Sequence, residues 1–313
     1  MDRLEAMAIL VASAEEGGFT AAGRKLGIPL PTVSRKVGEL ENRLKTKLFI
    51  RSTRKLILTE AGASYVAACK RILEYVGEAE AEAVGEYNVP RGELTLSAPI
   101  VFGRLHVVPV VSEFLSQFAE IQVRMTLSDR YVNLLDEHID MAVRVGELPD
   151  STLITTRVGS VRRIVCGSPG YFAKHGIPKT PDELTKHQCV TFSAMAAGMS
   201  WIFNSSRRKS RLVTPQCRLH ISTAEAAIDA AIKGLGVTNV LSYQVAQAVA
   251  EKKLKIVLQD FEPPPIPVHL IHAQQGLLPL KMRRFLDYAA PRIRQSVLTT
   301  QRKLGYGADE KHV

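Results

Sequence analysis

The sequence of 313 residues predicts a small all-α N-terminal domain, a long linker helix and a larger α/β C-terminal module. Three observations lead to this fold class. Apolar residues recur at helical spacing through residues 3–45, and a helical pattern without proline runs over residues 59–88. Beyond residue 91, strand-like and helical segments alternate, which is typical of α/β domains. A chain of this length also exceeds what one hydrophobic core comfortably serves, so two or three domains are expected.

Residues 3–16 form the first predicted helix, because apolar residues recur there every three or four positions. Gly17 and Gly18 end this helix. Thr20 can then cap a second helix of two turns, and Gly27 is expected to end it. The two helices are therefore separated by a short glycine turn.

Two prolines in the stretch LGIPLPTVSRKVGELE rule out one continuous helix and predict a tight turn followed by a third helix over residues 31–45. Pro31 is expected at the first position of this helix, where its missing amide has no intrahelical partner to lose. The helix has two distinct faces. The apolar stripe comprises Val33, Val37, Leu40 and Leu44, and the opposite face carries Thr32, Ser34, Arg35, Lys36 and Arg43.

Short apolar runs at 48–50 and 56–58 flank a basic turn and predict a small β-hairpin. Three helices followed by a basic hairpin are the plan of a winged helix-turn-helix domain, here residues 1–58. Ten basic and two acidic residues lie between positions 20 and 55, so this segment carries +8 of the formal net charge of +10. Such an excess favours a polyanionic partner, while a merely solvated basic face is the alternative.

Thr59 is suited to cap the linker helix over residues 59–88. A narrow apolar stripe runs along this helix, and a stripe on so long a helix requires a partner. We expect a homodimer formed through residues 59–88, and the alternative is packing on the chain's own C-terminal module. The stripe consists of Val66, Cys69, Ile72, Leu73, Val76, Ala79, Ala83 and Val84.

The stretch NVPRGELTLSAP marks the start of the α/β module, for which a largely parallel sheet is expected. The predicted strands are Leu94–Ser97, Ile121–Leu127, Met141–Val145, Ile164–Gly167, Cys189–Phe192, Trp201–Asn204, Leu219–Ser222, Val237–Leu241, Leu254–Leu258 and Val268–Ala273. The predicted helices are Leu105–Phe118, Thr223–Lys233, Tyr243–Ala250 and Leu280–Leu298.

Several function classes find no support in the residues. The four cysteines are scattered, with no CxxC pair and no histidine at metal-ligand spacing, so no metal and no cofactor are expected. The sequence lacks GxSxG, HExxH and Walker motifs, so no catalytic residue is assigned. The amphipathic N-terminus is unlike a signal peptide, and no apolar run reaches the ~20 residues of a membrane span. These features predict a cytoplasmic protein with no membrane partner.

These residues resemble the LysR-type transcriptional regulators. The stretch GGFTAAGRKLGIPLPTVSRKVGELENRLKTKLFIRSTRKLILTEAG is similar to the N-terminal signature of that family. The phrases DMAVRVGELPDSTLITTRVG, AEAAIDAAIKGLGV and LKIVLQDF are similar to its C-terminal effector module. Most members have Ser-Gln-Pro where this chain has Pro29-Leu30-Pro31, so a contact made through that Ser or Gln is not carried over.

The resemblance implies that the helix at 31–45 lies in the major groove of double-stranded DNA with its N-terminal residues at base edges. Arg35 is the expected guanine contact, because its guanidinium can bridge O6 and N7. A helix start suits a phosphate, and basic wing residues suit the DNA backbone. The expected DNA-binding residues are Thr20, Thr32, Ser34, Arg35, Lys36, Arg51, Ser52, Arg54 and Lys55.

By the same resemblance, residues 91–300 fold as two Rossmann-like subdomains similar to periplasmic solute-binding proteins. The chain is expected to cross between them near Arg157–Val161 and to return near Pro263–Val268. The expected bounds are 92–160 with 268–300 for the first subdomain, 161–267 for the second, and 301–313 for a flexible tail.

A ligand of such a protein binds between the lobes, at strand ends and helix starts. The expected effector-binding residues are Ser97, Ala98, Pro99, Ile100, Phe102, Ser128, Asp129, Arg144, Val145, Gly146, Phe203, Ser222 and Thr223. Arg144 suits a carboxylate, so a small organic acid is an expected effector; alternatively Arg144 pairs with an internal acid such as Asp129. His106 is expected to be structural. Cys166 lies near the expected cleft, and redox sensing through it is the weaker alternative.

Together these features predict a regulator that binds a pseudo-palindromic promoter site and responds to a small-molecule effector. The family resemblance further implies a homotetramer built from two dimers, and RNA polymerase as a partner. The alternative is a solute-binding protein or an enzyme that uses the α/β module. That alternative lacks both a catalytic motif and a secretion signal in this sequence.

Overall fold

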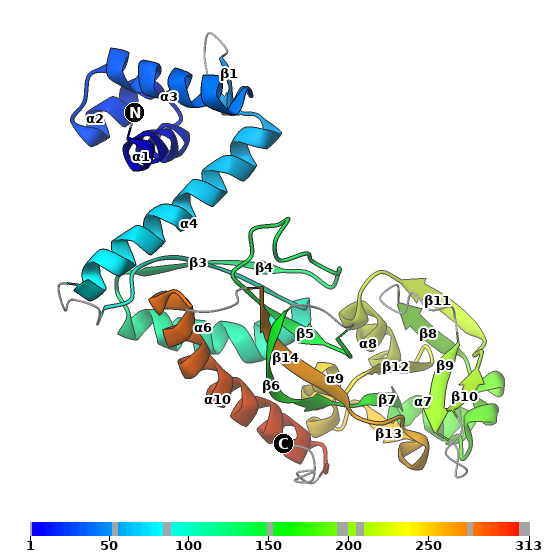
Figure 1. The fold of residues 1–313 in the computed structure, drawn as a ribbon. Coiled ribbons are helices and arrows are strands. Elements are labelled where there is room, and N and C mark those ends of the chain that lie inside the picture. Colours follow the sequence, from blue (N-terminus) through cyan, green and yellow to red (C-terminus); the bar gives the residue numbers. More distant parts are fainter. Residues whose placement is uncertain are drawn as a thin grey trace. The chain divides into compact units, whose positions relative to one another are not determined.

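The computed structural model describes residues 2–51, 56–83, 89–148, 153–192, 200–204, 210–273 and 278–306. The chain forms two compact units, residues 1–89 and 90–313, and each is described by itself (Figure 1). The N-terminal unit contains α1 (Arg3–Glu15), α2 (Phe19–Leu26), α3 (Leu30–Leu44), β1 (Phe49–Arg51), β2 (Leu56–Leu58) and α4 (Glu60–Ala83). Among the described residues, no helix is long and apolar enough to cross a membrane.

The turn between α2 and α3 follows from its glycines and prolines. Gly27 ends α2 in the left-handed conformation with φ of 69°, which glycine adopts without steric cost. Pro29 is the residue before α3, so Leu30 occupies the first helical position and Pro31 the second, one position later than predicted. A further correction concerns α2, which begins at Phe19 after Gly18, so Thr20 lies inside the helix and does not cap it.

The apolar stripe of α3 packs into the core of the N-terminal unit. Val33 and Val37 are fully buried and Leu40 is 1% exposed, as the helical spacing predicted. Phe19 and Phe49 meet edge to face with their ring centroids 5.5 Å apart, which ties the start of α2 to the hairpin. The antiparallel pair β1–β2 confirms the predicted hairpin.

Glu41 joins the C-terminal half of α3 to the hairpin. Its carboxylate is 3% exposed and accepts hydrogen bonds from the backbone amides of Leu48 (2.9 Å) and Phe49 (3.2 Å). Lys47 Nζ donates to the same carboxylate at 2.8 Å. Burial acts to raise the pKa of Glu41, but the ammonium and the two amides outweigh burial and lower that pKa below its ordinary value.

Helix α4 begins as predicted, because Thr59 Oγ1 accepts a hydrogen bond from the amide of Gly62 at 2.9 Å. Val66 and Cys69, which the sequence assigned to the intersubunit stripe, instead pack into the core of the N-terminal unit. Farther along, Ile72 and Tyr75 are 40% and 38% exposed. The helix therefore has two apolar faces, and the first is already covered by its own unit.

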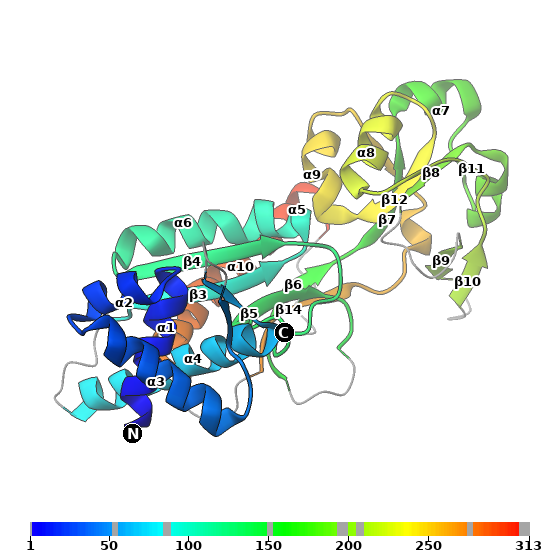
Figure 2. The ribbon, with the colours of Figure 1, turned by 90° about the horizontal axis from the view of Figure 1, so that it is seen from above.

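The C-terminal unit consists of two lobes, each with a five-stranded sheet (Figure 2). The first lobe has the strand order β4-β3-β5-β14-β6, and the second has β11-β8-β12-β7-β13. The strands of the first lobe are β3 (Gly92–Ala98), β4 (Ile121–Leu127), β5 (Met141–Val145), β6 (Ile154–Val161) and β14 (Ile266–His272). Those of the second are β7 (Arg163–Gly167), β8 (Cys189–Phe192), β11 (Cys217–Ile221), β12 (Val237–Leu241) and β13 (Lys255–Val257).

Both sheets are mixed, which corrects the expectation of a largely parallel sheet. In the first lobe β3 is parallel to β4 and β5, whereas β14 is antiparallel to β5 and β6. In the second lobe β8 is parallel to β11 and β12, whereas β7 is antiparallel to β12 and β13. The antiparallel strands are those next to the two crossings. The strand β6 continues to Val161, so the first crossing lies at Arg162, just beyond the expected segment.

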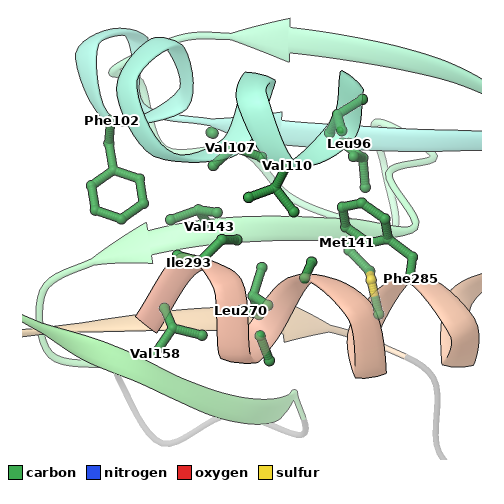
Figure 3. Packing of buried hydrophobic residues seen from close by; sticks show 14 of the residues in the cluster. Leu96, Phe102, Val107, Val110, Met141, Val143, Val158, Leu270, Phe285 and Ile293 are labelled. Atoms are coloured by element: carbon green, nitrogen blue, oxygen red, sulfur yellow. The ribbon is translucent and has the colours of Figure 1, made fainter. Parts of the chain in front are cut away.

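The core of the first lobe lies between its sheet and three helical elements: α5 (Ile100–Phe102), α6 (Val108–Gln117) and α10 (Leu280–Lys303). Figure 3 shows Phe102, Val107 and Val110 pointing toward strand and α10 side chains in one apolar cluster. Alternate residues of β5 face opposite ways, since Met141 and Val143 join this cluster while Ala142 joins another on the far face.

The second lobe covers both faces of its sheet. On one face pack α8 (Ala224–Ile232) and α9 (Ser242–Ala250). The other face packs against α7 (Pro169–His175), a 3-10 turn (Pro181–Lys186) and the antiparallel hairpin of β9 (Trp201–Asn204) and β10 (Ser210–Val213). The sequence did not predict β6, β10 or α7.

A π-helical turn, Gly103–Val107, joins α5 to α6. Val108 donates its amide to the carbonyl of Gly103, and Pro109 follows with no amide to give, so the helix widens here. The turn encloses His106, which is 3% exposed. The centroid of its ring lies 4.7 Å from that of Phe102, and its Nδ1 atom lies 2.8 Å from Ser296 Oγ. Burial lowers the pKa of His106 to about 4, in accord with its expected structural role.

Replacing Glu41 with Ala is expected to lower the free energy of unfolding of the N-terminal unit by about 1–3 kcal/mol, because two buried amides lose their acceptor. The wild-type carboxylate has a lowered pKa, so its contribution is present above its ordinary pKa of 4.5 and is lost as the pH falls through the folded value. Urea unfolding of the wild type and the variant at several pH values measures the loss of free energy and its pH dependence. The control Glu39→Ala removes an exposed ion pair and should cost less than about 1 kcal/mol; equal losses would contradict the assignment.

Replacing His106 with Gln is expected to flatten the pH dependence of stability of the C-terminal unit. The folded pKa of about 4 lies below the ordinary 6.5, so the unfolded chain takes up the proton first and stability falls as the pH drops from 6.5 to 4. The loss attributable to this one group is about 3 kcal/mol. Thermal unfolding of both proteins across this range tests it, and an unchanged slope in the variant would show that His106 is not the titrating group.

Candidate functional sites: an exposed helix edge and an interlobe cleft

The N-terminal edge of α3 is open to solvent. Arg35 is exposed, and Thr32 and Ser34 are half-buried beside it. The Arg35 guanidinium donates to the Glu39 carboxylate one turn later at 2.6 Å, an exposed pair that a stronger anion can displace. The buried stripe on the opposite face of α3 fixes this orientation. The edge is therefore a hydroxyl-bearing, cationic surface of the kind that reads nucleic acid.

The other expected DNA contacts fall into three groups. Lys36 turns toward α1, where it pairs with Glu5, and only 11% of its side chain is exposed. Thr20 is exposed on the first turn of α2, at the helix end that suits a phosphate. The side chain of Arg51 is not described, and Ser52, Arg54 and Lys55 lie outside the described residues.

At the carboxyl ends of β3 and β4, several expected effector residues come together. Asp129 Oδ1 accepts a hydrogen bond from the amide of Ile100 at 3.0 Å, and the Ser128 amide donates to the carbonyl of Ala98 at 2.9 Å. Pro99 precedes α5. Ser97 is 4% exposed and Phe102 is fully buried, so these two contribute mainly to the core.

Arg144 lies near the carboxyl end of β5, followed by Val145 and the positive-φ residue Gly146. Its guanidinium carbon is 3.3 Å from the centroid of the Tyr131 ring, a cation–π contact. Burial lowers the pKa of Arg144. Among the described residues, Arg144 forms no ion pair with Asp129 or with another acid. The internal acid partner that the sequence left open as an alternative is therefore not found there.

From the second lobe, Thr223 caps α8, because its hydroxyl accepts from the amide of Ala226 at 3.3 Å. Ser222 precedes it. In the first turn of the same helix, Glu225 pairs with Arg104 of the first lobe at 3.1 Å, so one end of α8 faces the other lobe. Phe203 lies away from this group, 2% exposed in the apolar cluster that also holds Trp201.

Two residues that were not predicted complete the cleft. Tyr243, at the start of α9, packs its ring edge to face on Phe102 across the lobes, with centroids 5.3 Å apart. Burial raises the pKa of Tyr243, the Asp129 carboxylate of the first lobe adds to this rise, and the Arg163 guanidinium of the second lobe opposes it. Arg163 is the register partner of Leu241, the last residue of β12, so it lies at the end of the sheet where β12 finishes. A signal was present in the sequence, since the pair Arg162-Arg163 stands at the lobe crossing.

Two observations concern redox and metal chemistry at the described residues. Burial raises the pKa of the Cys166 thiol to about 12, which keeps it protonated and argues against redox sensing at this position. No group of three or more His, Cys, Asp or Glu side chains able to hold a metal ion occurs within the ranges that the structure describes.

Comparisons with known proteins cover both units. A family model for the LysR substrate binding domain matches residues 88–294, and one for the bacterial regulatory helix-turn-helix protein, lysR family, matches residues 4–63. An HTH-type transcriptional regulator of Xanthomonas campestris pv. campestris (strain 8004) is 35% identical over 91% of this chain and 84% of that protein. The regulator CrgA of Neisseria meningitidis serogroup B is 29% identical over 91% of this chain and 95% of its own length.

Solved structures give the same result. The chain is similar to CrgA, a LysR-type transcriptional regulator from Neisseria meningitidis, with a TM-score of 0.59 and 29% identity over 92% of this chain and 98% of that one. It is also similar to the Vibrio cholerae virulence activator AphB, with a TM-score of 0.58, 26% identity and the same coverage. The chain therefore belongs to the LysR family of bacterial transcriptional regulators, with a helix-turn-helix domain that binds DNA and a C-terminal domain that binds an effector.

Proposed function

We propose that α3 binds the major groove of a promoter site through Thr32, Ser34 and Arg35. The observation that carries this proposal is the exposed guanidinium of Arg35 at the open end of a helix whose opposite face is buried. On a duplex, this guanidinium exchanges the Glu39 carboxylate for a guanine edge. Thr20 at the start of α2 and the basic wing at Arg51, Ser52, Arg54 and Lys55 hold phosphates, which set register and salt dependence.

Lys36 has a different role in this proposal. Its ammonium is already paired with Glu5 and its side chain is mostly covered, so it braces α3 against α1. A protein that relies on Arg35 for base recognition needs such a brace, because small rotations of the helix would move the guanidinium off a base edge. The proposed base-reading set is therefore smaller than the sequence suggested.

The proposed effector is a small molecule bound between the lobes of the C-terminal unit, beside Asp129, Arg144, Thr223 and Tyr243. Support comes from the convergence of strand ends from the first lobe and helix starts from the second, and from the Arg104–Glu225 contact between them. An effector changes DNA binding only if it binds one arrangement of the subunits better than another.

The proposed dimer forms through the second apolar face of α4. Ile72, Tyr75 and Ala79 are exposed and recur at three and four residues, whereas Val66 and Cys69 are occupied by the core of their own unit. A twofold-symmetric pair of α3 helices suits a pseudo-palindromic site. A tetramer and a contact with RNA polymerase are further proposals that rest on the family alone.

Replacing Arg35 with Ala is expected to weaken binding to the promoter DNA beside the protein's own gene by about 10- to 100-fold, the loss of one bidentate base contact. Binding to random duplex DNA should change much less. Fluorescence anisotropy at fixed salt measures both affinities. The matched control is Arg124→Ala, which removes an exposed arginine of the C-terminal unit that pairs with Glu93. Equal losses in the two variants would contradict a base-reading role for Arg35.

Replacing Ile72 with Glu is expected to shift the protein from dimer toward monomer, because a carboxylate would be buried in an apolar contact. Sedimentation velocity measures the change. The control Ala63→Glu adds the same carboxylate at an exposed position on the opposite side of α4. If both variants remain dimeric at the concentration where the wild type dimerises, the proposed face of α4 is not the interface.

A further inference from the structure

Beside the crossing between the lobes lies a cation for which the described residues provide no counter-ion. Arg163 is partly buried at the start of β7, and its Nη1 atom is enclosed with no hydrogen-bond partner. No ion pair to its guanidinium is present within the described ranges. Buried guanidinium groups are ordinarily paired, because an uncompensated charge in a low-dielectric site costs several kcal/mol.

The preceding arginine shows what a satisfied guanidinium looks like in the same fold. Arg162 pairs with the Glu262 carboxylate at 3.7 Å and lies 4.9 Å over the Tyr306 ring. In the first lobe, Arg144 lies on the Tyr131 ring. Burial lowers the pKa of Arg163, and the one group found to oppose this is the phenol of Tyr243. Arg163 therefore differs from Arg162 and Arg144, whose guanidinium groups both have partners.

The position of Arg163 directs it to the space between the lobes. Leu241, its register partner, ends β12, and the parallel strands β8 and β12 end at this same sheet edge. Tyr243 follows two residues later and crosses to Phe102 of the first lobe. An anion at Arg163 would therefore contact the phenol that already bridges the two lobes.

We propose that Arg163 binds the carboxylate of a small organic acid, with the Tyr243 hydroxyl as a second donor. This inference rests on the proposed effector cleft, and it adds Arg163 as the residue that anchors the carboxylate. A planar guanidinium matches a carboxylate through two parallel hydrogen bonds. A single negative charge suits the site better than a phosphate dianion, because the Asp129 carboxylate also acts on Tyr243 and would repel additional charge.

The test compares thermal unfolding of the full chain with acetate, butyrate and phenylacetate as sodium salts at constant ionic strength. The corresponding amides serve as probes of equal shape without charge, and inorganic phosphate serves as a different anion. We expect at least one carboxylate to raise the melting temperature by about 2–4 °C in the wild type, and neither its amide nor phosphate to do so.

Arg163→Met supplies the decisive variant. This variant should no longer show the rise in melting temperature with a carboxylate. Without ligand, its melting temperature should equal or exceed that of the wild type, because an apolar chain of similar length replaces an unpaired cation. Arg162→Met is the matched control. It should lower the melting temperature, because the Glu262 carboxylate loses its ion pair and keeps only the hydrogen bond from Tyr306, and it should keep the carboxylate shift.

Three outcomes would overturn the inference: no shift with any carboxylate, an equal shift with phosphate, or a ligand-free Arg163→Met that melts well below the wild type, which would mean that the arginine is structurally paired. The thermal assay needs no DNA. Failure of the wild type to bind promoter DNA would therefore reject the proposed function, whereas these three outcomes reject only the assignment of Arg163.

Discussion

The buried stripe of α3 is the constraint on which the N-terminal unit depends. Val33, Val37 and Leu40 lose nearly all their exposure to solvent, and this burial leaves one direction for the rest of the helix to face. Glu41 then ties the same helix to the hairpin through two backbone amides, although a carboxylate is costly to bury without such partners. The exposed edge with Arg35 is a consequence of these contacts, and the pair of Lys36 with Glu5 adds a further contact that holds α3 against α1.

The C-terminal unit depends on contacts both within and between its two lobes. Each lobe packs apolar clusters against its mixed sheet, and Tyr243 and Leu241 of the second lobe also pack into the cluster of the first. Between the lobes, the described contacts include the aromatic pair of Phe102 and Tyr243 at 5.3 Å, a hydrogen bond from Gln301 Nε2 to Ser242 Oγ at 2.9 Å, and an exposed ion pair at 3.1 Å. Among the described residues, the partly buried guanidinium of Arg163 has no ion-pair partner near these contacts. A ligand that pairs with Arg163 in one arrangement of the lobes would favour that arrangement.

Local patterns in the sequence predicted most elements and failed where tertiary context decides. Strands Met141–Val145 and Val237–Leu241 match their predicted bounds because both are short, β-branched runs beside clear turns. The mixed sheets were not predictable, since strand direction depends on partners far away in sequence. The sequence pattern predicted a single apolar stripe on α4, whereas the helix has two apolar faces. Spacing alone does not distinguish a residue that packs into its own unit from one that is exposed to solvent. Arg163 was missed because a missing partner is visible only in three dimensions.

The most direct measurement of the central claim is site-specific photo-crosslinking to promoter DNA. A photoreactive phenylalanine analogue at position 34, on the open edge of α3, is compared with the same analogue at position 131, which is 65% exposed in the C-terminal unit. The account predicts crosslinks to the duplex from position 34 and none from position 131. Crosslinks from position 131 together with their absence from position 34 would contradict it.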